Sequence, residues 1–100
     1  WGLSRSPELN QHPSRALPRL DATTAPEEAW LRVEHQALVA LPKGGGVLFA
    51  IRIAMHALKD VKLNQPAAAG LARALRSMPP EAAAYKGLAD CRARFAQWLE

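Results

Sequence analysis

Hydrophobic and polar side chains alternate along two runs, residues 31–41 and residues 47–56. A period of two is typical of a β-strand that is buried on one face. The run of Pro42-Lys43-Gly44-Gly45-Gly46 lies between them, and its glycines can adopt the positive φ that tight turns require. The pattern predicts an antiparallel β-hairpin over residues 30–58.

The polar positions of the two predicted strands come together if the apolar sets share one face. Placing Leu41 opposite Val47 puts Gln36 opposite Arg52 and Glu34 opposite Ala54. His56 has the same parity as Arg52 and therefore lies on the same face. The predicted polar face therefore carries Glu34, Gln36, Arg52 and His56.

Residues 1–29 contain four prolines, which exclude a long helix or an interior strand. We expect Trp1 and Leu3 to form the end of a strand that leads into a proline-rich surface loop. Thr24, with Glu27 three residues further on, fits the cap of a short helical segment.

Residues 64–100 have a helical pattern. Asn64 is the expected cap of a helix that starts near Pro66, and apolar residues then recur at helical spacing. Gly87 suits a left-handed cap after a second, short helix, and Asp90 is the expected cap of the last helix. The predicted fold class is α+β, an antiparallel hairpin or sheet followed by helices.

Composition narrows the class of protein. The chain has 100 residues, 49% hydrophobic and 22% charged, which is typical of one globular domain with a modest core. Arg52 interrupts the longest apolar run, so we expect no membrane span. Cys91 is the only cysteine, which favours a reducing, cytoplasmic compartment. The sequence lacks an initiator methionine, and we interpret it as part of a longer domain.

The net charge is +4, which raises the prior for anionic partners such as nucleic acid or a cofactor that carries phosphates or propionates. The arginines are scattered and form no basic run, so we expect no nucleic-acid partner. The triple glycine lacks the continuation of a phosphate-binding loop. No nucleophile triad or paired zinc motif occurs.

Three stretches of the chain suggest a family. LRVEHQALVALPKGGGVLFAIRIAMHAL, at 31–58, and LRSMPPEAAAYKGL, at 75–88, follow SPEL at 6–9 in the same order as in that family. The chain resembles the haem-dependent oxidative N-demethylase alpha-subunit-like proteins of bacteria. In those proteins the strands look like L-R-V-E-R-Q-T-L-x-R-L-P and F-T-I-R-T-Y.

The resemblance implies a PAS-like fold that binds haem b, of which residues 1–100 would be the C-terminal part. It also implies an oxidoreductase that removes methyl groups from small secondary amines such as dimethylamine and releases formaldehyde. The electrons would come from NADPH through flavin and iron-sulfur partner subunits. The sequence departs from the family where Ala37 replaces a threonine and Ala54 replaces a tyrosine, which weakens or changes the expected reaction.

Two interpretations of the predicted polar face stay open. Glu34, Gln36 and Arg52 form either a charge-assisted network that ties the hairpin to a neighbouring loop or a site that orients a haem propionate. His56 is either a surface histidine or the axial ligand of the haem iron. The sequence assigns no catalytic residue. The alternative function is a non-catalytic PAS-like haem-binding or sensory module.

Overall fold

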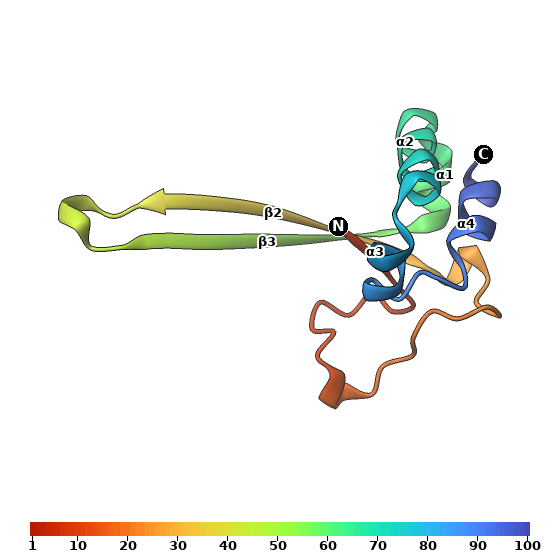
Figure 1. Ribbon diagram of the computed structural model, residues 1–100, viewed down its shortest axis with the longest axis horizontal. Helices are drawn as coiled ribbons and strands as arrows, with labels where there is room; N and C mark the ends of the chain where they lie inside the picture. Colours follow the sequence, from red (N-terminus) through yellow and green to blue (C-terminus); the bar gives the residue numbers. More distant parts are fainter.

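The computed structural model describes all residues from 1 to 100 (Figure 1). Three strands are followed by four helices. The elements are β1 (Gly2–Ser4), β2 (Trp30–Ala40), β3 (Val47–Ala57), α1 (Leu58–Leu63), α2 (Gln65–Ser77), α3 (Pro80–Tyr85) and α4 (Arg92–Leu99). Single 3₁₀ turns lie at Pro13–Arg15, Pro26–Glu28 and Pro42–Gly44. The α+β class is confirmed, whereas the PAS-like assignment stays a prediction.

The strands form one antiparallel sheet in the order β1-β2-β3. The predicted hairpin is confirmed, because β2 and β3 pair along their whole length from Trp30 opposite Ala57 to Ala40 opposite Val47. Strand β1 pairs only with the base of β2, where Leu3 lies opposite Leu31. The sheet is therefore three strands wide at its base and two strands wide beyond it.

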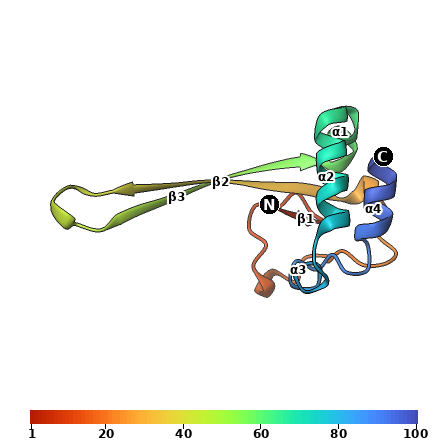
Figure 2. The same ribbon diagram turned by 45° about the horizontal axis from the view of Figure 1, so that its top comes forward.

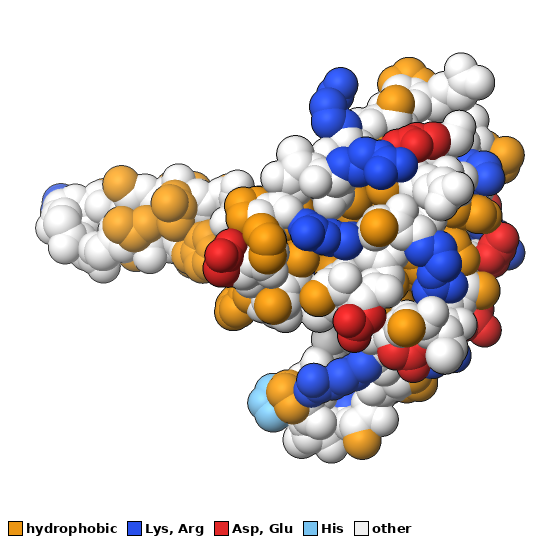
Figure 3. Space-filling model, turned by 45° about the vertical axis from the view of Figure 1, so that its right-hand side comes forward, with side chains coloured by type: hydrophobic (Ala, Val, Ile, Leu, Met, Phe, Trp, Pro, Cys, Tyr) orange, Lys and Arg blue, Asp and Glu red, His pale blue; other side chains and the backbone are white.

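The hairpin projects from the rest of the chain as a long arm (Figures 1 and 2). The helices pack only at its base, so the molecule measures 51 × 34 × 26 Å. Beyond the base both faces of the arm are open to solvent: Leu38 is 72% exposed on one face, and Leu48 is 54% exposed on the other. The expectation of a half-buried hairpin is therefore wrong for its outer part. Figure 3 shows that the arm carries hydrophobic side chains and few charged ones.

The register of the hairpin differs from the predicted one by one residue. Val47 lies opposite Ala40 and not opposite Leu41, because the Leu41 N–H donates to the Gly46 carbonyl at 2.9 Å and closes a shorter loop. A shift of one residue moves every side chain of one strand to the other face. Burial does not set the register here, since neither face of the outer arm is covered.

The core lies between the helices and the base of the sheet, and helices α2 and α4 pack against each other over it (Figure 2). Its largest fully buried apolar side chains are Phe95, Leu58, Leu75 and Leu88. The Leu58 N–H donates to the Ala29 carbonyl at 2.9 Å and ties the start of α1 to the chain before β2. No helix is both long enough and apolar enough to cross a membrane.

Two of the four predicted caps are confirmed. The Asn64 side chain accepts a hydrogen bond from the Ala67 N–H at 3.1 Å at the start of α2, and Gly87 has the left-handed φ of +69° after α3. The other two are wrong. Cys91 occupies the cap position of α4 in place of Asp90, and Thr24 bonds Asp21 instead of capping the turn at Pro26–Glu28.

The turn of the hairpin offers a test of its local stability. Lys43 has a φ of +57°, and left-handed backbone costs a residue with a side chain about 1 kcal/mol. We expect Lys43→Gly to remove this strain and to slow amide hydrogen exchange at Leu41 by roughly five-fold. Lys43→Ala is the matched control, because it removes the charge but keeps the Cβ. Equal exchange rates in the two variants would contradict the prediction.

Candidate functional site

The four residues expected on one polar face lie on two opposite faces of the hairpin. Residues directly opposite each other in the ladder share a face, and Arg52 lies opposite His35 while His56 lies opposite Leu31. Glu34 and Gln36 lie opposite the apolar residues Ile53 and Ile51. The predicted convergence is wrong, because the observed register pairs odd positions of β2 with even positions of β3.

The histidine face is the side of the hairpin that carries His35, Arg52 and His56. All three side chains are exposed. Their neighbours on this face are aliphatic, including Val33 and Ala54. Successive residues on one strand rise by about 3.3 Å, so the Cα atoms of Arg52 and His56 are roughly 13 Å apart.

The opposite face carries a linear polar network along β2. The Arg32 Nε donates to Glu34 Oε1 at 3.4 Å, and the Gln36 Nε2 donates to Glu34 Oε2 at 3.2 Å. The bond from Gln36 and then the bond from Arg32 lower the pKa of the Glu34 carboxyl below its usual value. Arg32 also donates to the Leu9 carbonyl at 2.7 Å. The predicted strap between hairpin and loop exists, but Arg32 forms it in place of Arg52.

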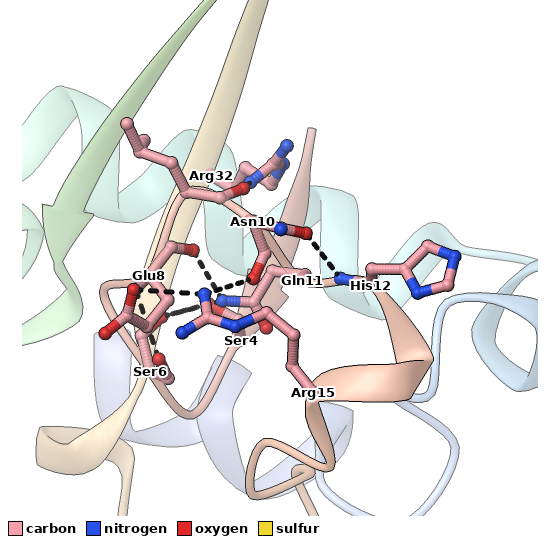
Figure 4. A network of polar contacts seen from close by, with 9 residues as sticks. Ser4, Ser6, Glu8, Asn10, Gln11, His12, Arg15 and Arg32 are labelled. Carbon is pink, nitrogen blue, oxygen red and sulfur yellow. Dashed lines mark hydrogen bonds and ion pairs between the residues drawn. The ribbon is translucent and has the colours of Figure 1, made fainter.

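The loop that Arg32 holds has its own polar contacts (Figure 4). Arg15 Nη1 donates to the Glu8 carboxylate at 3.3 Å and to the Asn10 carbonyl at 3.1 Å. Gln11 Nε2 donates to the Glu8 carbonyl at 2.6 Å, and the Ser4 hydroxyl donates to the Ser6 carbonyl at 2.7 Å. These bonds fix the shape of a segment that has almost no regular secondary structure.

The His12 N–H donates to Asn10 Oδ1 at 3.0 Å and joins this network, but Figure 4 shows the His12 ring turned away from Glu8 and Arg15. The Ser14 N–H donates to His12 Nδ1 at 3.2 Å, and Ser14 Oγ lies 2.8 Å from the same nitrogen. The backbone bond favours the tautomer that has its proton on Nε2, with the Ser14 hydroxyl as a second donor to Nδ1. His12 therefore offers an N–H donor on the side away from Ser14.

The proline-rich loop and the connection between α3 and α4 enclose a groove of about 640 Å³. Residues 11–13 and 16–20 form one wall, residues 84–87 with Ala89 and Asp90 form the other, and residues 3–5 also line it. This volume lies within the range of small-molecule sites, about 300 to 1,000 Å³. The sequence did not predict this groove, because its walls are far apart along the chain.

The groove contains the Tyr85-Lys86-Gly87 motif. Lys86 Nζ donates to the Trp1 carbonyl at 2.7 Å and lies 5.4 Å from the centre of the Trp1 ring. Tyr85 is 92% exposed at the same edge. The motif thus holds the N-terminal segment against α3 and places one ammonium and one phenol beside the groove.

Arg5 also lines the groove, but carboxylates hold its guanidinium. Its Nη2 is 3.3 Å from Glu28 Oε2, and its Nη1 is 3.7 Å from Asp21 Oδ2. Asp21 in turn accepts bonds from the Thr23 hydroxyl at 2.7 Å and the Thr23 N–H at 2.8 Å. These contacts fix the end of the proline-rich loop.

Metal ligation by clustered side chains has no support in the chain. No group of three or more His, Cys, Asp or Glu side chains is placed to hold a metal ion. Cys91 is buried, and desolvation raises the pKa of its thiol, which disfavours the thiolate that metals bind. A haem needs only one or two protein ligands, so single histidines are the relevant candidates.

Fold and site define the class as a small α+β protein with an antiparallel sheet, a face with two imidazoles and one guanidinium, and a separate basic groove. A comparison with protein families then identifies its relatives. The family described as "Haem-dependent oxidative N-demethylase, alpha subunit-like" matches residues 1–95. The chain belongs to this family, which confirms the resemblance found in its sequence.

The hydrogen bonds of Asp21 predict a pH dependence. They lower the pKa of its carboxyl from 3.8 to about 2, with the Thr23 hydroxyl as the largest cause. Because the folded pKa is depressed, the stabilisation is complete above about pH 4 and is lost as the pH falls towards 2. We expect Thr23→Val to raise the pKa of Asp21, measured by carboxyl NMR titration. Ser77→Ala is the control, and an unchanged pKa in Thr23→Val would contradict the assignment.

Proposed function

We propose that this chain is part of a haem-dependent oxidoreductase that oxidatively demethylates small secondary amines, such as dimethylamine, and releases formaldehyde. The family match over residues 1–95 is the observation that carries the proposal. The family description supports haem dependence and N-demethylation. The amine, haem b and the cytoplasmic location are parts of the proposal. So is the assignment of residues 1–100 to the C-terminal part of one PAS-like haem domain.

The donor chemistry of the histidine face fits a haem. An imidazole binds ferrous and ferric iron, and a guanidinium pairs with a propionate carboxylate in a bidentate way. The face offers both groups among aliphatic neighbours that can cover an apolar macrocycle. We assign His56 as the iron ligand and Arg52 as the residue that binds a propionate.

Glu34 and Gln36 receive a different role, because they lie on the other face. They belong to the network that fixes Arg32 against the Leu9 carbonyl. In this proposal they position β2 relative to the proline-rich loop and touch neither the haem nor the substrate.

Bound haem supplies the activation of dioxygen, with one oxygen atom entering formaldehyde and the other leaving as water. The electrons are proposed to come from NADPH through flavin and iron-sulfur partner subunits. The residues of this chain would bind and orient the haem: His56 would hold the iron, and Arg52 would hold a propionate and so orient the macrocycle. Aliphatic side chains such as Val33 and Ala54 would cover one side of the bound macrocycle and keep water from it.

A ligation experiment tests the role of His56. Haem is titrated into the full chain, and we expect a Soret band with the position of an imidazole-bound haem. His56→Gly should shift this band, and added free imidazole should restore its position. Arg73→Ala, an exposed change on α2, is the control. A band that is the same in His56→Gly and in the original chain would exclude His56 as the ligand.

A turnover experiment then separates the two functions that the family resemblance allows. With haem, NADPH and a flavin and iron-sulfur reductase present, dimethylamine should yield formaldehyde. We expect Arg52→Ala to lower the yield several-fold, because the macrocycle loses a contact that orients it. Haem binding without any formaldehyde would assign the chain to the alternative, a PAS-like haem-binding or sensory module.

A further inference from the structure

The groove between the proline-rich loop and the α3–α4 connection is lined by more cationic than acidic side chains. Its charged lining consists of Arg5, Arg19, Lys86 and the single acid Asp90. Arg5 is already paired with Asp21 and Glu28. Two cations remain, Arg19 on one wall and Lys86 on the other, against the single carboxylate of Asp90.

Neither of these two cations is neutralised by a carboxylate. Arg19 forms no side-chain hydrogen bond or ion pair in the chain, and the partner of Lys86 is the neutral Trp1 carbonyl. A neutral partner orients the ammonium without cancelling its charge. The electrostatic potential inside the groove is therefore positive, which favours an anionic ligand.

His12 adds a donor to the same wall. Its Nδ1 accepts the Ser14 N–H, so its Nε2 carries the proton of the neutral ring. With its proton on Nε2, the ring can donate a hydrogen bond to an oxyanion. His12 can therefore contribute to anion recognition in the groove.

Apolar side chains occur on both walls of the groove, beside the polar side chains of Ser4, Gln11 and Tyr85. Leu17, Pro18 and Leu20 lie on one wall, and Ala84 and Ala89 lie on the other. An anion that is small and fully hydrated, such as inorganic phosphate, would leave these side chains without a partner. Cationic and apolar side chains in one groove fit a ligand that has an apolar body and one oxyanion.

We propose that this groove binds an apolar organic carboxylate, with Arg19, Lys86 and the Nε2–H of His12 as donors to the carboxylate. The site is separate from the histidine face and does not depend on iron ligation by His56. Two sources carry this chemistry: the propionates of a porphyrin and a separate organic acid.

The probe is 2-naphthoate, compared with 2-naphthamide, which has the same apolar body without the charge. Binding is followed by amide NMR shifts in the full chain at Ala16, Gly87 and Ala89. We expect shifts at these positions with naphthoate and at least ten-fold weaker binding of the amide. Equal affinity of the two probes, or shifts confined to other parts of the chain, would overturn the proposal.

Substitutions of the two cations test whether they bind the carboxylate of the probe. Arg19→Met and Lys86→Gln should each weaken naphthoate binding by roughly ten-fold, and Arg19→Lys should retain most of the affinity. Arg19 has no side-chain hydrogen bond or ion pair to lose, so we expect its variants to keep the fold even if Lys86→Gln disturbs the N-terminal segment. Arg73→Met removes one charge outside the groove and is the matched control. The proposal fails if Arg19→Met and Arg73→Met weaken binding equally.

Competition with haem separates the two sources. If haem displaces naphthoate from the original chain, the porphyrin propionates are the ligand of the groove. If haem leaves naphthoate bound, the ligand is a separate organic acid. We expect His56→Gly to alter the Soret band and to leave naphthoate affinity unchanged, so failure of the haem proposal and failure of this one are distinguishable.

Discussion

The turn at Pro42–Gly46 determines what the two faces of the hairpin can do. One hydrogen bond, from Leu41 to Gly46, fixes which residue of β3 lies opposite each residue of β2. A loop longer by one residue would place Arg52 beside Gln36 instead of His35. The separation of Arg52 and His56 from Glu34 and Gln36 is therefore a consequence of loop length and not of side-chain preference.

Local signals in the sequence predicted the elements well. The alternation from Leu31 to Met55 and the cap at Asn64 depend only on neighbouring residues, and both agree with the structure. The register could not be predicted in the same way, because the argument assumed that one face is buried. Apolar parity sets a register only where a core covers it, and the arm beyond Val33 has no such cover.

The groove escaped prediction for a different reason. Its donors come from Arg19, Lys86 and His12, which are distant in sequence and carry no shared motif. Scattered basic residues were the only signal, and scatter along a chain says nothing about proximity in space. The contact between Arg32 and Glu34 could have been predicted from the sequence, because Arg32 lies two positions before Glu34 and therefore on the same face of the strand.

Strand β3 lies at the margin of the sheet and has no neighbour along its outer side. Every second residue from Val47 to Ala57 directs its amide and carbonyl outward there, away from β2. An extended segment of any sequence can bond to this row through its main chain alone, which makes the margin a template for a fourth strand. Growth of the sheet in that direction would need no change in the helices.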